Sequence, residues 1–205
     1  MKTYLRPCAA VSSEIIIKHS RFICYIAPVS GREAAEAFIE SIRQQHPKAN
    51  HNCWSYVAGY PEDPQQWNCS DDGEPKGTAG QPMLNILRHS GIGEICAVVT
   101  RYFGGVKLGT GGLVRAYGQS LNESIRLLET EPVVPQLDIS LSAGYELTGD
   151  LEQLISRFNI LVKERLFEQQ LLIHGSIETQ LLEDLKLALQ PIQHKVSLSY
   201  DDKAA

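Results

Sequence analysis

This 205-residue sequence contains no long apolar run. Residues 1–10 (MKTYLRPCAA) are too short and too polar to form the apolar core of a signal peptide, and no stretch approaches the length of a membrane span. We therefore expect a soluble, cytoplasmic protein that does not enter a membrane. The apolar content of 43% is enough for a proper core in one large domain or two small ones.

Closely spaced cysteine pairs are also missing. The five cysteines are odd in number and far apart, and no C-x-x-C pair occurs among them. This spacing favours reduced, mostly buried thiols over a disulfide framework or a structural zinc site.

The sequence has no excess of positive charge, since its formal net charge is −5. Thirteen basic and thirteen acidic residues lie in residues 1–132, whereas six basic and eleven acidic residues lie beyond them. This distribution argues against a strongly basic protein that coats nucleic acid by charge alone. It leaves room for a local basic face on a neutral first domain.

Glycine, by contrast, is concentrated in one region. Eleven of the sixteen glycines lie between Asp71 and Gly118. Most of them belong to two loops, the acidic loop (residues 71–79) and the glycine loop (residues 103–112), and a helical pattern follows each loop. Because glycine is costly in chain entropy, such a concentration usually marks turns with positive φ or places where the backbone approaches something closely. We expect these loops to form the functional surface of the protein.

The glycine loop lies between a buried strand and a long helix. Residues 94–101 (EICAVVTR) predict a strand buried on both faces, and apolar residues at helical spacing predict a helix from Leu113 to about Glu129. A helix N-terminus after such a loop presents free N–H groups that suit a phosphate or a carboxylate. The candidate anion-binding or partner-binding residues are Arg101, Gly104, Gly105, Lys107, Gly109, Thr110, Gly111, Gly112 and Arg115.

Two familiar phosphate motifs do not fit the glycine loop. A Walker A loop has a lysine before its final serine or threonine, whereas here Gly109 is followed directly by Thr110. The run GGVKLGTGG does not match the dinucleotide fingerprint either. The alternative to anion binding is a glycine-rich connection that packs the helix tightly against the sheet.

The acidic loop has the opposite sign, because Asp71, Asp72 and Glu74 fall within four positions. We predict no resident metal or cofactor, although these carboxylates could hold Mg²⁺ through waters beside a phosphate on the glycine loop. They could instead pair with the basic residues named above and order the two loops. A solvated acidic turn is the third alternative.

Residues 51–59 (HNCWSYVAG) alternate as a strand, with Trp54 on one side and His51 on the other. Trp54 could stack on a nucleic-acid base, although core packing is the commoner role of a large aromatic. His51 is an acid/base candidate, but no partner lies near it in the sequence. We regard both as auxiliary site residues.

The whole pattern predicts an α+β protein with two domains. Residues 1–132 contain two early strands, a helix, two further strands, a short helix from Pro82 to about His89 and the glycine loop region. Residues 131–135 (EPVVP) predict a linker. Residues 136–205 then follow the βαββαβ order of the ferredoxin-like motif, with acidic helices and no evident catalytic set.

Three runs resemble the IMPACT family: HNCWSYVAG (residues 51–59), SDDGEPKGTAGQPML (residues 70–84) and VVTRYFGGVKLGTGGLVRAYG (residues 98–118). The resemblance implies a first domain similar to domain 2 of ribosomal protein S5. It also implies a ferredoxin-like second domain similar to one in translation elongation factors. Eukaryotic members of the family are linked to translational control through a protein partner that activates a starvation-sensing kinase.

Two hypotheses about function follow. The first is a non-enzymatic, translation-associated regulator that contacts RNA, the ribosome or a protein partner through the glycine loop. The second is a Mg²⁺-dependent enzyme acting on a phosphate-containing small molecule or nucleotide, with the acidic loop on the metal. We favour the first, because no pair of nucleophile and base is evident in the sequence.

Overall fold

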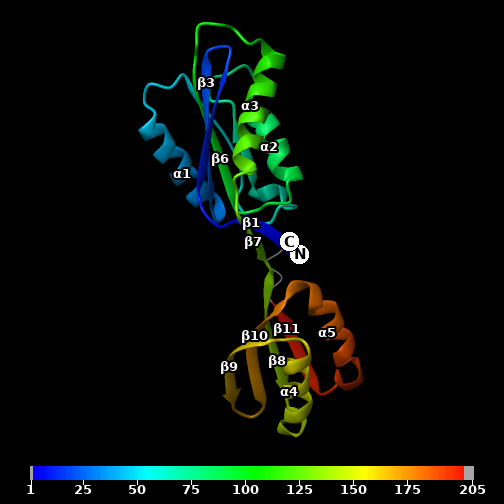
Figure 1. Cartoon of the computed structure of the whole chain (residues 1–205). Helices are drawn as coiled ribbons and strands as arrows, with labels where there is room; N and C mark the ends of the chain where they lie inside the picture. The colour runs from blue at the N-terminus through cyan, green and yellow to red at the C-terminus, as the bar shows by residue number, and fades with distance from the viewer. Residues whose placement is uncertain (1, 201–205) are drawn as a thin grey trace. The chain divides into compact units, whose positions relative to one another are not determined.

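The computed structural model describes residues 2–200, which form two compact units (Figure 1). Tyr4 to Val133 make up the first unit, and the second unit begins at Val134. Each unit has a hydrophobic core of its own. Among the described helices, none combines the length and the apolar character needed to cross a membrane.

A five-stranded antiparallel sheet forms the middle of the first unit, in the order β2-β3-β6-β4-β5. Its strands are β2 (Val11–Ile17), β3 (Ser20–Pro28), β4 (His51–Val57), β5 (Trp67–Ser70) and β6 (Ile95–Tyr102). Seven of the eight residues of the central strand β6 are buried. A strand covered on both faces is apolar along its length, so the prediction of a buried strand is confirmed.

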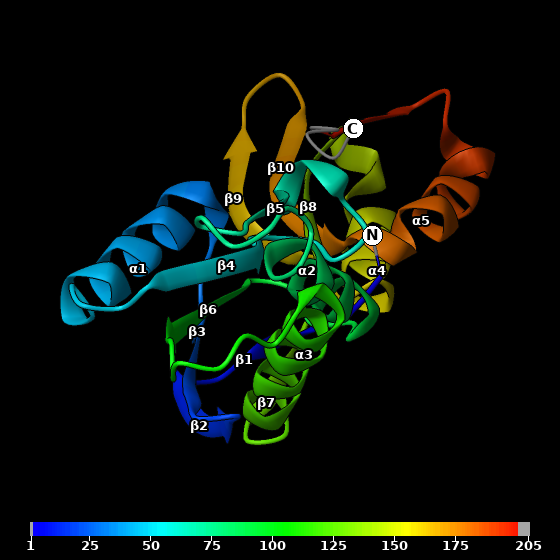
Figure 2. The same ribbon diagram turned by 90° about the horizontal axis from the view of Figure 1, so that it is seen from above.

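Helices cover both faces of this sheet (Figures 1 and 2). They are α1 (Gly31–Gln45) on one face, and α2 (Gly80–His89) and α3 (Thr110–Ile125) on the other. Successive side chains of β6 point to opposite faces. Cys96 and Val98 therefore join the core under α1, while Ala97 and Val99 join the core under α2 and α3.

The predicted bounds of the two helices on that face need correction. α3 begins at Thr110, three residues before the predicted Leu113, and ends at Ile125 rather than near Glu129. The N–H groups of the first helical turn have no acceptor within the helix in any case, so glycine is tolerated in that turn. The last glycine of the loop therefore does not mark the start of the helix. Two glycines of the glycine loop consequently belong to α3. In the same way, α2 begins two residues earlier than predicted.

The predicted linker, residues 131–135, contains the boundary between the two units, but part of it is a strand. Its first residues form β7 (Thr130–Val133), which pairs antiparallel with β1 (Tyr4–Pro7) in a two-stranded ribbon. Both strands of such a ribbon are edges, where a proline with no N–H to donate can be accommodated. Pro7 and Pro132 therefore mark edge strands here rather than a break in structure. A short 3-10 helix, η1 (Pro64–Gln66), completes the first unit.

The second unit has the predicted βαββαβ order, with an antiparallel sheet in the order β11-β8-β10-β9. Its elements are β8 (Gln136–Ala143), α4 (Thr148–Arg157), β9 (Leu161–Phe167), β10 (Leu171–Glu178), α5 (Leu182–Leu189) and β11 (Val196–Tyr200), with 3-10 turns η2 (Tyr145–Leu147), η3 (Thr179–Leu181) and η4 (Gln190–Ile192). Leu141 and Ile173 of the sheet pack with Leu151 of α4 and Leu185 of α5. Alternating apolar residues on the strands therefore produced a sheet with one face against the two helices.

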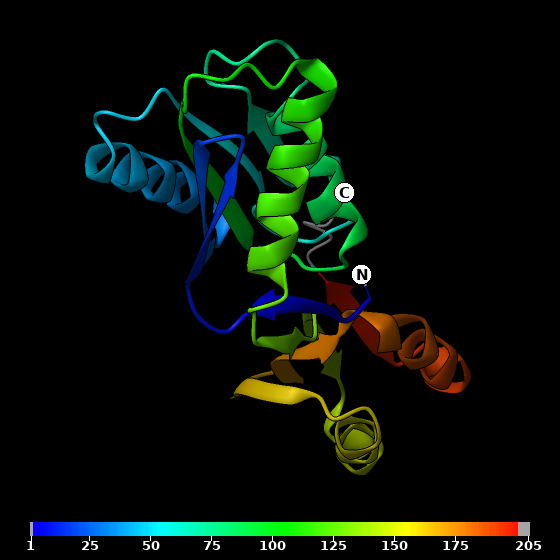
Figure 3. The same cartoon turned by 45° about the horizontal axis from the view of Figure 1, so that its top comes forward.

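Four connections of the first unit meet at one end of its sheet, called the loop end here. They are the β2–β3 turn (residues 18–19), the α1–β4 turn (residues 46–50), the acidic loop and the glycine loop. The register causes this meeting, because His51 at the start of β4 pairs with Arg101 near the end of β6. Figure 3 shows the acidic loop and the glycine loop running together near the start of α3. Residues distant in sequence are thereby brought side by side.

Candidate functional site

A cleft of about 510 Å³ opens at the loop end between the acidic loop and the glycine loop. Its floor contains the buried side chains of Glu74 and Arg101 and the half-buried ring of His51. Phe103 and Lys107 are among its exposed lining residues. Residues of both loops thus line one cavity.

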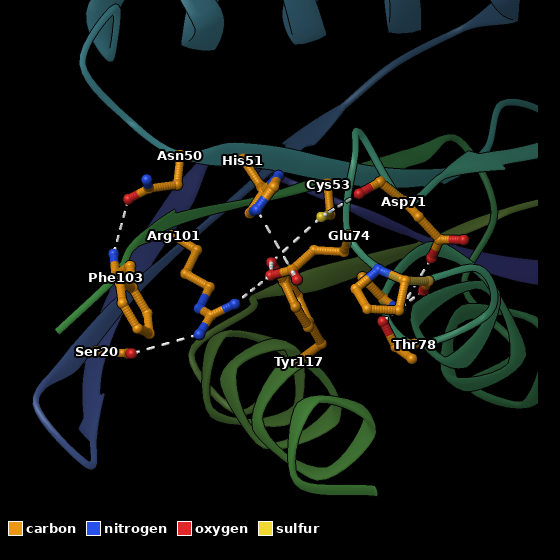
Figure 4. Close-up of polar contacts among 12 residues, drawn as sticks. Ser20, Asn50, His51, Cys53, Asp71, Glu74, Thr78, Arg101, Phe103 and Tyr117 are labelled. Carbon is orange, nitrogen blue, oxygen red and sulfur yellow. Dashed lines mark hydrogen bonds and ion pairs between the residues drawn. The ribbon is translucent and has the colours of Figure 1, made fainter. Parts of the chain in front are cut away.

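A buried ion pair joins the two loops at the cleft floor. Nη1 of Arg101 lies 2.6 Å from Oε1 of Glu74, and the two side chains are only 7% and 3% exposed (Figure 4). The carboxylate neutralises most of the charge that the guanidinium would offer to a bound anion. Arg101 therefore lies at the site that the sequence indicates, but as part of the scaffold. This is the loop-ordering alternative for Glu74.

Tyr117 of α3 completes this arrangement. Its hydroxyl donates a hydrogen bond of 2.8 Å to the same Oε1 of Glu74. Burial, followed by the neighbouring Cys53 and Glu74, raises the pKa of Tyr117, so its hydroxyl stays protonated and able to donate. One carboxylate oxygen thus ties the acidic loop both to the sheet and to α3.

The ring of His51 is fixed by the acidic loop. Its Nδ1 lies 2.8 Å from the carbonyl oxygen of Asp72, and a carbonyl can only accept, so Nδ1 carries the proton. The other ring nitrogen, Nε2, lies 3.9 Å from Oε2 of Glu74, which is beyond hydrogen-bond distance. Neither Nε2 of His51 nor Oε2 of Glu74 makes a hydrogen bond with the described residues.

Asp71 shapes the acidic loop from within. Its Oδ1 accepts hydrogen bonds from the backbone N–H groups of Ala79 and Gly80, and its Oδ2 accepts one from Gly77. Burial acts to raise the pKa of Asp71, but these three N–H groups together outweigh it and hold the pKa below its usual value. Asp71 therefore caps the start of α2 and folds the loop back on itself.

Asp72 points in another direction. Its Oδ2 accepts from the backbone N–H of Asn52 at 2.6 Å, and its Oδ1 pairs with Arg43 of α1 at 3.1 Å. The carboxylates of Asp71, Asp72 and Glu74 thus have three separate sets of partners. No group of three metal-ligating side chains occurs within residues 2–200.

The start of α3 presents free backbone donors at the rim of the cleft. Gly109 occupies the N-cap with φ 73° and ψ 165°, and no side chain caps the helix. The first intrahelical bond joins Leu113 N–H to the Gly109 carbonyl. The N–H groups of Thr110, Gly111 and Gly112 therefore lack acceptors in the part of the chain that the structure describes. Such an end attracts negative charge.

Not every glycine of this loop serves the cleft. A Cβ at Gly104 would overlap the backbone of His19 in the β2–β3 turn, so this residue is glycine because two chain segments touch. Gly105 has φ +85° and no neighbour within 4 Å of its Cβ position. The packing alternative therefore applies to Gly104, whereas Gly109 positions the free helix end.

The loop end carries exposed cations that have no carboxylate partner in the described chain. They are Lys18, Lys48, Lys76, Lys107 and Arg115. Arg115 bonds only a backbone oxygen, that of Gly111, at 3.2 Å. The nearby acidic side chains are already paired with Arg43, Arg101 or backbone N–H groups. The loop end is consequently rich in unpaired positive charge, although the whole chain is acidic.

The aromatic residue at the cleft is not the one that the sequence singled out. Trp54 stacks on Tyr56 at 5.6 Å and packs in the core under α1, on the opposite face of the sheet from the cleft. Phe103 is 45% exposed, lines the cleft and has the guanidinium of Arg101 5.6 Å from its ring centre. Its position directly before the glycines, where a strand has just ended, was the available signal. Tyr117, a member of an ordinary apolar helix stripe, gave none.

Comparison with known proteins places this architecture in a family. Residues 18–125 match the Impact N-terminal domain. The chain is 50% identical over 157 residues to the IMPACT family member YigZ of Escherichia coli (strain K12), covering 77% of each chain. It is 46% identical over 168 residues to an IMPACT family member of Haemophilus influenzae, covering 82% of each. A crystal structure described as that of a hypothetical protein is 40% identical, with a TM-score of 0.71 over 99% of each chain. The chain belongs to the IMPACT family.

Proposed function

We propose that this protein is a non-enzymatic binding protein of the translation apparatus in the cytoplasm, and that its loop end binds single-stranded RNA. The observation that carries the proposal is the set of unpaired cations on the loop end, of which Lys107 lines the cleft, together with the free N-terminus of α3 at its rim. Basic side chains and helix N-termini are the groups that bind the phosphates of nucleic acids.

The cleft also offers a surface for a base. Phe103 is exposed beside Lys107, and aromatic side chains next to a basic groove are typical of proteins that bind single strands. The surface beyond the loops is neutral or acidic, so binding by charge over the whole molecule is not expected. A local contact with a few nucleotides fits the size of the cleft.

The connection to translation rests on family membership, since the IMPACT family is linked to translational control. We further propose that the first unit is similar to domain 2 of ribosomal protein S5. The second unit would be ferredoxin-like and similar to an elongation-factor domain, which its sheet order β11-β8-β10-β9 supports. Likeness of this kind is an analogy of fold and does not by itself assign function.

The Mg²⁺-dependent enzyme is not proposed. Its metal site would need Asp71, Asp72 and Glu74 together, whereas each of these carboxylates has its own protein partners. No specific observation within the described residues favours it over the binding role.

Fluorescence anisotropy with a labelled single-stranded RNA tests the proposal. We expect the wild type to bind, and Lys107→Glu to weaken binding at least about tenfold and to lower the slope of log affinity against log salt by about one. Lys195→Glu, which changes an exposed lysine of the second unit, is the matched control and should bind as the wild type does. Absence of RNA binding by the wild type, or an equal loss in both variants, would overturn the proposal.

A further inference from the structure

We propose that Nε2 of His51 and Oε2 of Glu74 form a base-recognition subsite on the cleft floor, which accepts the exocyclic amino group of one unpaired RNA base. The inference rests on the proposed RNA binding and specifies which part of the nucleotide enters the cleft. It predicts a preference for adenine, cytosine or guanine over uracil.

Two hydrogen-bond acceptors face each other on this floor. With its proton on Nδ1, the uncharged form of His51 has a lone pair on Nε2, and Oε2 of Glu74 has only lone pairs. At 3.9 Å they are too far apart to form a hydrogen bond with one another. A ligand group that brings two N–H donors satisfies both atoms at once. An amino group on an aromatic ring is such a group.

Both acceptors are held in place before any ligand arrives. The ring of His51 is fixed by the carbonyl of Asp72, and Oε1 of Glu74 is fixed by Arg101 and Tyr117. Because these partners use the other atom of each side chain, the acceptors facing the cleft cannot turn away without breaking those bonds. A site held this way binds without a large ordering cost.

The hydrogen-bond donors and acceptors of the cleft lie in separate regions, as do the phosphate and the base of a nucleotide. Donors lie at the rim, where Lys107 and the N–H groups of α3 are found, and acceptors lie on the floor. A phosphate carries only acceptors in this context, so the carboxylate of Glu74 would repel it from the floor. Phe103 and Leu108 add apolar surface to the lining of the cleft. A phosphate at the rim and a base on the floor satisfy all of these groups.

A basic peptide is the other ligand that could offer N–H donors to the floor. The rim argues against it, because Lys107 is exposed and unpaired with a carboxylate, and would repel a second positive charge. RNA is attracted by the rim and offers amino groups to the floor, so the same occupant fits both regions. Among the four bases, only uracil lacks an exocyclic amino group.

The experiment compares labelled oligomers of adenosine, cytidine and uridine with wild-type protein at one salt concentration. A fourth oligomer contains purine ribonucleoside, which is adenosine without its amino group. We expect the adenosine and cytidine oligomers to bind about tenfold more tightly than the uridine and purine oligomers. Equal binding of all four overturns the subsite while leaving the proposed function intact. Binding of none overturns the proposed function, and the subsite with it.

Variants of the two acceptors give an independent readout. His51→Phe keeps a ring but removes Nε2, and should abolish the preference for adenosine over uridine. His89→Phe is the matched control, because His89 also places Nδ1 on a backbone carbonyl, that of Asn85, but lies at the end of α2 outside the cleft lining. Retention of the full base preference in His51→Phe contradicts the subsite.

Glu74→Gln is a stricter test of the subsite, because the amide nitrogen places a donor where Oε2 of Glu74 is an acceptor. The carbonyl oxygen of glutamine can still accept from Arg101 and Tyr117. The base preference should then move toward uridine, whose carbonyl oxygens accept hydrogen bonds. An unchanged preference in a folded Glu74→Gln variant counts against the assignment. Should this variant fail to fold, the comparison of oligomers on the wild type still decides.

Discussion

Arg101 and Glu74 are 27 residues apart in the sequence, yet their side chains meet at 2.6 Å almost entirely out of solvent. A charge in such a position is tolerated only while its partner is present. The pair therefore holds the acidic loop against the end of β6 and forms the floor of the cleft.

Removal of one partner should be costly. Arg101→Met leaves the carboxylate of Glu74 buried without its cation, and we expect the free energy of unfolding to fall by about 3–5 kcal/mol in urea denaturation. A double variant, Arg101→Met with Glu74→Leu, should recover much of this loss because neither buried charge remains.

The surface pair of Arg32 and Glu36 is the control. Its guanidinium and carboxylate lie 2.7 Å apart, close to the 2.6 Å of the cleft pair, but its side chains are 73% and 51% exposed. Glu36→Gln should therefore change stability by less than about 1 kcal/mol. Similar losses for Arg101→Met and Glu36→Gln would show that the cleft pair is not a structural tie.

Tyr117→Phe tests the second tie on Glu74. The change removes one donor to a buried carboxylate but keeps the edge-to-face contact between this ring and Phe22 at 5.3 Å. We expect a loss of about 1.5–3 kcal/mol, the usual value for a hydrogen bond to a charged group, measured by urea denaturation. A loss as large as that of a Phe-to-Ala cavity would mean that the ring itself has moved.

Local pattern was sufficient for most of the fold. β6 and the βαββαβ order of the second unit were predicted because a continuous apolar run and the alternation of apolar and polar residues are patterns of neighbouring residues. β7 was missed for the opposite reason, since only its pairing with β1, more than a hundred residues away, makes Pro132 part of a strand. The propensity of a segment to form a strand can be estimated from that segment alone, whereas the pairing of two strands depends on a partner that is distant in the sequence.

The site was less accessible to sequence reasoning. The loops were recognised from their glycines, but the role of each side chain depended on contacts across the fold. Arg101 looked like a free cation, and only the register of β4 against β6 and the return of the acidic loop reveal its pairing with Glu74. Phe103 and Tyr117 gained their roles in the same way, by position in space rather than by spacing in the chain.

Gly104→Ala and Gly111→Ala separate packing from helix formation in the glycine loop. A methyl group at Gly104 would overlap the backbone of His19, so we expect a loss of about 1–3 kcal/mol from overpacking. At Gly111 the nearest atom to an added Cβ is the end of the Arg115 side chain at 3.9 Å. Alanine there should be neutral or stabilise the helix by up to about 1 kcal/mol. Thermal unfolding of both variants checks this contrast, and equal effects would contradict it.

Cysteine labelling tests burial in the first unit. Cys8 is exposed, whereas Cys24, Cys53 and Cys96 are buried. Burial raises the pKa of the Cys24 thiol to about 12, and the thiolate is the form that reacts with an alkylating agent. Brief iodoacetamide treatment at neutral pH should modify Cys8 and leave these three cysteines intact, as read by mass spectrometry of peptides. Treatment in denaturant should modify all of them. Rapid modification of Cys24 in the native protein would contradict the packing of the sheet.

The carboxylate of Asp71 should make stability depend on pH. Its pKa is lower in the folded protein than in the unfolded chain, because backbone N–H groups of the acidic loop and α2 outweigh the opposing effect of burial. A lowered pKa contributes stability that is fully present above the unfolded value, about pH 4, and is lost as the pH falls through the folded value.

We expect Asp71→Asn to cost about 1–3 kcal/mol at neutral pH. The difference from the wild type should shrink as the pH is lowered below about 4, because the wild type then loses the same carboxylate. Asp150→Asn, at an exposed position in α4, is the control and should cost less than about 1 kcal/mol. Urea denaturation over a range of pH measures all three proteins, and a difference between Asp71→Asn and the wild type that grows toward acid pH would contradict this role for Asp71.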